Sequence, residues 1–112
     1  MPLQATFVSG SPEMVDYTPG SAVTAGDVIV TADTVRIAHV DIEANRLGSL
    51  AANGGVYRVK ADTAIAADKK VYWVDASNEV TETAGSNKVF GVTVEASSAS
   101  DAYINVRHDI GA

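Results

Sequence analysis

The sequence contains no cysteine. Disulfide bonds, thiolate metal sites and thiol nucleophiles are therefore excluded, and redox chemistry gives no guide to the compartment. Packing and assembly must stabilise the 112 residues. A chain of this length buries about 65% of the surface that its unfolded form exposes, so we expect one domain with a small core.

Long hydrophobic runs are also missing. No apolar stretch approaches the roughly 20 residues that a membrane-spanning helix needs. Residues 1–10 lack the basic start and the long apolar stretch of a signal peptide. We therefore expect no membrane partner, and we expect the protein to be made in the cytosol and either used there or carried away inside an assembly.

Cations are scarce relative to anions. The chain has 8 Lys and Arg residues against 14 Asp and Glu residues, which gives a formal net charge of −6 and a pI near 4.6. The average field of such a chain repels phosphate backbones, anionic lipids and acidic substrates. The charge therefore predicts no nucleic-acid partner.

Valine, alanine and threonine are abundant, whereas leucine is scarce and aromatic residues make up only 6% of the chain. β-Branched residues pack well on a pleated surface, so this composition favours sheet over helix. Short apolar segments recur between turn signals, as in sandwiches and barrels. The sequence predicts an all-β fold, either a small antiparallel β-barrel or a β-sandwich with short hairpins, and alternation alone does not separate the two.

The apolar segments and the turns between them outline a series of short strands. The expected strands cover residues 13–18, 28–30, 35–42, 47–51, 56–60, 69–74, 79–83, 88–95 and 101–108. Residues 5–8 are also strand-like, but no partner segment follows them directly. Residues 1–10 are therefore predicted as an extended N-terminal arm and residues 11–112 as a single β domain.

Two connections have local signals. Asn53-Gly54-Gly55 offers residues that accept the positive φ of a tight hairpin turn. This turn is expected to join segment 47–51 to segment 56–60. The segment 43–48 is the best place for a helical turn, although it is too short to form a helix unaided.

Alternation assigns side chains to faces of the predicted strands. In segment 88–95, one face is expected to carry Phe90, Val92 and Val94. In segment 101–108, the inward residues are expected to be Ala102, Ile104 and Val106, and the outward residues Tyr103, Asn105 and Arg107. Tyr72 and Trp73 are adjacent, so one ring should enter the core and the other should rest on the surface. The sequence does not decide which.

Residues suited to catalysis are few. His39 follows an apolar segment and is interpreted as a packed or edge histidine, whereas His108 is expected near the exposed C-terminus. Their spacing does not place both on one face, so no zinc site is predicted. A Gly-x-Ser-x-Gly nucleophile elbow is absent, and Gly85-Ser86-Asn87-Lys88 does not complete a P-loop. We therefore expect a protein that is not an enzyme and that binds no cofactor or metal.

An ordered series of short motifs runs from residue 25 to residue 107. It consists of Ala25-Gly26-Asp27-Val28, Ile37-Ala38, Asp41-Ile42, Gly48, Gly54-Gly55-Val56-Tyr57, Lys60, Ala64-Ile65, Val71-Tyr72-Trp73, Thr81 to Thr83, Asn87-Lys88-Val89-Phe90-Gly91-Val92 and Ile104-Asn105-Val106-Arg107. In order and spacing the series resembles a family of tailed-phage capsid cement proteins, or head decoration proteins. Members of this family are often labelled as predicted recombinases, a label that the missing P-loop contradicts here.

The resemblance implies a small β-barrel or β-sandwich that decorates the outer surface of a phage capsid and stabilises the shell. The implied partners are the major capsid protein and further copies of the chain, commonly in a homotrimer. The implied location is the outer capsid surface of the virion, after synthesis in the host cytoplasm. Similar proteins tend to have glycine where this chain has Asn45 and Asp68-Lys69, so those turns are expected to differ.

The predicted arm suggests how such a protein attaches. An extended arm adds a strand to an exposed sheet edge of a partner, and main-chain hydrogen bonds then supply affinity. We expect Thr6, Phe7 and Val8 to form this capsid-binding segment. The alternative function is a β-module that binds glycans or host surfaces through exposed aromatic residues. Its candidate residues are Trp73, Tyr72, Tyr57 and Tyr103.

Overall fold

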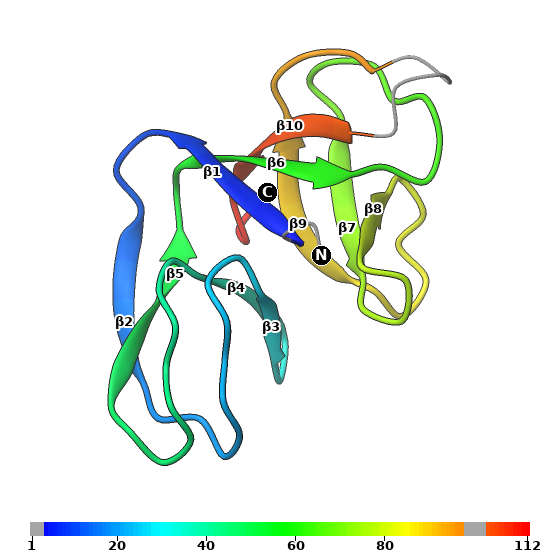
Figure 1. The fold of residues 1–112 in the computed structure, drawn as a ribbon. Coiled ribbons are helices and arrows are strands. Elements are labelled where there is room, and N and C mark those ends of the chain that lie inside the picture. Colours follow the sequence, from blue (N-terminus) through cyan, green and yellow to red (C-terminus); the bar gives the residue numbers. More distant parts are fainter. Residues whose placement is uncertain (1–3, 98–102) are drawn as a thin grey trace.

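A computed structural model describes residues 4–97 and 103–112 of the chain. These residues form ten strands and no helix, which confirms the all-β prediction (Figure 1). The strands are β1 (Ala5–Ser9), β2 (Glu13–Tyr17), β3 (Val28–Thr31), β4 (Thr34–Ala38), β5 (Gly48–Asn53), β6 (Val56–Lys60), β7 (Lys70–Val74), β8 (Glu79–Thr81), β9 (Lys88–Thr93) and β10 (Tyr103–His108).

The strands are divided between two antiparallel sheets (Figure 1). The six-stranded sheet has the order β1-β6-β10-β9-β7-β8, and the four-stranded sheet has the order β2-β5-β4-β3. An isolated parallel bridge joins Ala61 to Val80, so the six-stranded sheet curls until β6 approaches β8. Among the described residues no ladder closes this curl into a barrel, so the architecture is sandwich-like.

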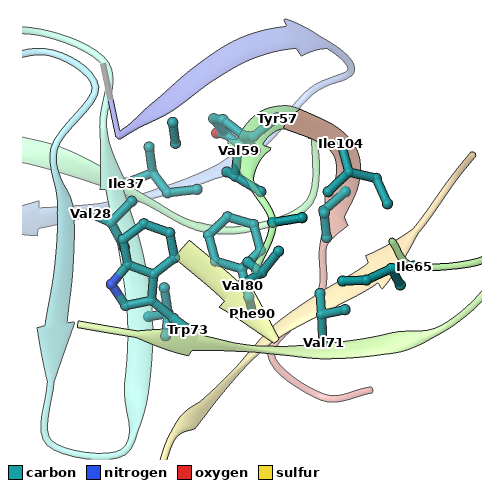
Figure 2. Close-up of a cluster of buried hydrophobic side chains, with 14 of the residues drawn as sticks. Val28, Ile37, Tyr57, Val59, Ile65, Val71, Trp73, Val80, Phe90 and Ile104 are labelled. Carbon is teal, nitrogen blue, oxygen red and sulfur yellow. The ribbon is translucent and has the colours of Figure 1, made fainter. Parts of the chain in front are cut away.

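The main hydrophobic core lies between the sheets. Trp73, Phe90 and Tyr57 of the six-stranded sheet belong to the same buried cluster as Val28 and Ile37 of the four-stranded sheet (Figure 2). Burial of these side chains away from water is the dominant favourable contribution to folding. The four-stranded sheet also buries its other face, where a second cluster gathers. Its members are Val23, Ala38, Ile42 and Leu50.

The turn at Asn53-Gly54-Gly55 has the predicted backbone but a different role. Gly54 and Gly55 have φ values of 87° and 82°, yet β5 pairs with β2 and β4 while β6 pairs with β1 and β10. The predicted hairpin is therefore wrong, because the turn carries the chain from one sheet to the other. The backbone of His108 holds it: Gly54 N–H donates to His108 O at 2.7 Å, and His108 N–H donates to Gly55 O at 2.9 Å.

The N-terminal segment is part of the sheet. Ala5–Ser9 pairs with β6 as strand β1, whereas the sequence suggested an arm over residues 1–10. Ala5 is buried, with 2% of its surface exposed, and its N–H donates to Gly26 O at 3.0 Å. These contacts connect segments that are distant along the chain, so no local sequence pattern predicts them. Residues 1–3 of the predicted arm lie outside the described residues.

A bulge changes the face assignment in β9. Val71 pairs with Gly91 and Tyr72 with Val89, so Phe90 is an extra residue in the β9 strand. An extra residue shifts the alternation by one position. Phe90 is buried, but Val92 is only half-buried and Val94 is 44% exposed, so the prediction that the three share one face is wrong.

The other face assignments stand in the residues that the structure describes. In β10, buried Ile104 and Val106 alternate with Tyr103, Asn105 and Arg107, as predicted; Ala102 lies outside those residues. Of the adjacent pair on β7, Trp73 enters the core with 1% of its surface exposed, and Tyr72 is half-buried beside Lys70.

Two turns keep a conformation that favours glycine without having glycine. Asn45 has a φ of 63° and Asp68 a φ of 61°. Asn and Asp enter this left-handed region more readily than other residues with a side chain. The segment 43–48, where a helical turn was expected, contains a turn at residues 44–45 and no helix.

Candidate partner-binding edge

The first two strands of the described chain are both edge strands, one in each sheet. β1 is an edge strand of the six-stranded sheet, and β2 is an edge strand of the four-stranded sheet. Phe7, Val8 and Met14 on this segment are 43%, 48% and 42% exposed. Exposed apolar side chains on an edge strand favour pairing with another chain. Residues 5–17, called the edge segment below, are therefore the candidate site of partner binding.

The three predicted binding residues differ in their placement on β1. Thr6 pairs with Arg58 and is exposed, whereas Phe7 pairs with Tyr57. Val8 lies at a register shift between Phe7 and Ser9 and has no ladder partner on β6. The structure thus brings together Thr6, Phe7 and Val8 on one short edge strand, and it directs Phe7 toward a cluster of aromatic rings.

The aromatic cluster consists of Phe7, His39 and Tyr57. The Phe7 ring centroid lies 5.0 Å from that of His39 and 5.6 Å from that of Tyr57. His39 Nε2 and the Tyr57 hydroxyl form a hydrogen bond of 2.5 Å. Ring pairs at such distances contribute about 0.5–1.5 kcal/mol beyond the burial of their area. The cluster therefore holds the exposed Phe7 side chain in a defined position.

Burial keeps the His39–Tyr57 pair uncharged at neutral pH. It raises the pKa of Tyr57 to about 12, and it lowers the pKa of His39 from its usual value of 6.5. A phenol with so high a pKa remains protonated at pH 7 and is not activated as a nucleophile. The pair has the properties of a structural hydrogen bond.

A cavity of about 240 Å³ opens beside this cluster. Its walls come from β1, β4, β6 and the turn before β3, and most of them are apolar. The lining residues are Ala5, Phe7, Ala25, Gly26, Ile37, Ala38, His39 and Tyr57. This cavity was not predicted from the sequence. Residues of four separate segments form it, so no single motif signals it.

His108 lies inside the protein, which corrects the expectation that it is near an exposed terminus. It is fully buried, and its Nε2 lies 2.7 Å from Val35 O in the opposite sheet. Its Nδ1 is buried without a hydrogen-bond partner in the described part of the chain. Burial lowers the pKa of His108, against smaller opposing effects of the Val35 hydrogen bond and the Asp109 charge.

The two histidines both contact the ring of Tyr57, which their separation in sequence did not suggest. The Tyr57 centroid is 5.6 Å from His39 and 5.9 Å from His108. Among the described residues, however, no group of three or more His, Asp or Glu side chains is arranged to hold a metal ion. Both histidine rings pack against Tyr57, and His108 links the two sheets through its hydrogen bond to Val35.

The aromatic residues proposed for glycan binding divide into two groups. Trp73 and Tyr57 are buried, with 1% and 0% of their surfaces exposed, so neither ring can stack on a sugar at the surface. Tyr103 lies under the Arg58 guanidinium at 5.3 Å, and Tyr72 lies under the Lys70 ammonium at 5.6 Å. The structure thus removes two of the four candidates for this alternative.

The fold and the edge segment define a small β-module built around packing and an exposed sheet border. Comparison with protein families matches residues 8–108 to the phage cement proteins. The chain belongs to this family, which confirms the resemblance seen in its motifs. The family is a structural kind of protein and places the chain among the components of phage capsids.

No curated protein matches the chain. In the ranges 4–97 and 103–112, no helix is long and apolar enough to cross a membrane.

Proposed function

We propose that the protein is a non-enzymatic cement protein that binds the outer surface of a phage capsid and stabilises the shell. Its partner is the major capsid protein. The match of residues 8–108 to the phage cement family carries this proposal. The exposed apolar edge segment supports it, because this segment supplies a surface for pairing with another chain.

The contact lies at Thr6, Phe7 and Val8 on β1. Phe7 and Val8 present apolar surface at the sheet border, and Thr6 is exposed beside them. Since β1 is a paired strand, the contact is made by a strand held in place rather than by a loose arm. The entropy that a loose arm would lose on binding is then already lost in folding.

We propose further that the protein acts as a homotrimer. Three copies held together present three edge segments, so the second and third contacts form at a high effective concentration. A ligand that binds only the assembled shell stabilises it by mass action. Sedimentation of the free protein measures the oligomeric state. A protein that remains monomeric at the concentrations that saturate capsids contradicts the trimer.

Cosedimentation with capsids of the same phage tests the function. Purified protein is mixed with undecorated expanded capsids and with unexpanded precursors, and we expect it to pellet with at least the expanded form. Absence from both pellets contradicts the proposal. Heating decorated and bare capsids then measures stabilisation, and we expect decoration to raise the temperature at which the shell opens.

A matched pair of variants locates the contact. Val8→Asp places a charge on the β1 border, and Val40→Asp makes the same change at a residue that is 55% exposed in the β4–β5 connection. We expect Val8→Asp to weaken capsid binding at least tenfold and Val40→Asp to leave it unchanged. Equal binding by the two variants contradicts the location.

A further inference from the structure

The outer edge of β1 lies directly beside the apolar cavity. Ala5 N–H donates to Gly26 O, so it points away from β6. Polar groups of a strand alternate in direction with a period of two, so the N–H and C=O of Phe7 point the same way. β1 ends the sheet on this side, so these Phe7 groups face outward from the sheet edge.

The cavity has room for a side chain. An apolar cavity of about 150 Å³ holds a benzene-sized molecule, and the cavity beside Phe7 measures about 240 Å³. It therefore accepts one side chain between leucine and phenylalanine in size. Its walls include Ala5, Ala25 and Ala38, whose small side chains leave this space.

The lining disfavours a charged ligand. None of the eight lining residues is Asp, Glu, Lys or Arg, and the Nε2 of His39 bonds to the hydroxyl of Tyr57. A phosphate, a carboxylate or a metal ion would meet no opposite charge or free ligand set here. An apolar side chain on an extended backbone matches both features, because its main chain can bond to Phe7 while its side chain fills the cavity.

We propose that this groove, formed by the outer edge of β1 at Phe7 and the adjoining cavity, receives an extended segment of the capsid subunit. The segment pairs with the main chain of Phe7 and inserts one leucine- to phenylalanine-sized side chain. The inference rests on the proposed function and specifies what is recognised. The cement protein supplies the fixed strand and the shell supplies the incoming one, the reverse of the arm insertion expected from the sequence.

Filling the cavity tests the side-chain half of the inference. Ala25 is half-buried in the lining, whereas Ala22 is exposed in the same β2–β3 connection. We expect Ala25→Phe to weaken binding to undecorated expanded capsids at least tenfold and Ala22→Phe to leave it unchanged. Thermal melts of both variants identify any loss of binding that comes from unfolding.

Blocking the edge tests the main-chain half. Proline is tolerated on an edge strand where the missing N–H faces outward, so Phe7→Pro retains the ladder with β6. Phe7→Ala is its control, because it loses the same ring but keeps the N–H. We expect Phe7→Pro to bind the capsids about fivefold more weakly than Phe7→Ala, the loss of one ordinary hydrogen bond.

A photo-crosslinking amino acid at position 8 gives an independent readout, because residue 8 does not line the cavity and the lining stays unchanged. We expect it to attach to one strand-forming segment of the capsid subunit that carries a large apolar residue. If wild-type protein does not pellet with capsids, the proposed function fails. If it pellets, but Ala25→Phe and Phe7→Pro match their controls and crosslinks fall on scattered segments, the groove is not the site and the proposed function stands.

Discussion

The Nε2 of His108 and the carbonyl oxygen of Val35 are 2.7 Å apart, and they join β10 of one sheet to β4 of the other. The bond is fully buried, and the second ring nitrogen, Nδ1, has no partner in the described residues. In the neutral ring, Nε2–H donates to Val35. A proton added at Nδ1 would be buried without an acceptor, so this link depends on a neutral histidine.

This arrangement predicts a loss of stability in mild acid. Burial lowers the pKa of His108 in the folded state, so below the unfolded value of about 6.5 the unfolded chain binds this proton more readily. The free energy of unfolding should therefore fall as the pH drops from about 7 toward 5. Urea denaturation at several pH values measures the effect.

Two variants separate His108 from the other titrating groups. The pKa of His39 is also lowered by burial, but His39 is only half-buried and contributes less. We expect His108→Gln to flatten the stability profile between pH 7 and pH 5 more than His39→Gln does. An equally steep profile in His108→Gln contradicts the assignment.

Gly91 predicts a large steric effect in β9. A Cβ at this position would overlap the carbonyl oxygen of Arg107 on β10, because the two backbones approach closely at the bulge. Gly91→Ala should therefore lower the free energy of unfolding by about 3 kcal/mol or more. Gly20→Ala is the control, since a Cβ there meets nothing within 4 Å, and its effect should stay within about 0.5 kcal/mol.

The turn between β3 and β4 predicts a stabilising substitution. Ala32 has a φ of 52°, a conformation that costs a residue with a Cβ about 1–2 kcal/mol. Ala32→Gly removes this cost but adds about 0.4–1 kcal/mol of unfolded-state entropy. We expect a net gain of about 0.5–1 kcal/mol, read as a higher urea midpoint. Ala22→Gly, where φ is not positive, should give no gain.

Trp73 predicts both a stability change and a spectroscopic signal. It is the only tryptophan in the sequence, and its ring lies 5.7 Å from that of Phe90 in the core. Trp73→Ala should cost about 3–5 kcal/mol. In the wild type, Trp73 fluorescence should be blue-shifted and poorly quenched by iodide until the protein unfolds. Efficient quenching of the folded protein contradicts the burial.

The sequence predicted those strand pairs whose partners are close along the chain. The expected strands 28–30 and 35–42 follow each other along the chain and form the β3–β4 hairpin, and the expected strands 69–74 and 79–83 form the β7–β8 hairpin. In these places the turn residues and the alternation lie within one window. Short-range patterns are sufficient when the pairing is itself short-range.

The remaining features depend on contacts between distant segments. β1 pairs with β6 across about 50 residues, and the turn at Gly54-Gly55 is held by His108. The positive φ of the turn was readable from the sequence, but the choice of sheet was not. The Phe90 bulge and the groove beside Phe7 likewise arise only where separate strands meet. Part of the candidate site was therefore predictable as residues, but its geometry was not.

The edge segment has a consequence for synthesis on the ribosome. Residues 5–17 are translated before their ladder partners β5 and β6, which span residues 48–60. At about 5–20 residues per second, β1 and β2 wait several seconds for these partners. During this interval Phe7, Val8 and Met14 are without their strand neighbours. The surface that we propose for the capsid is thus accessible to the chaperones of the host before its own strand partners have been made.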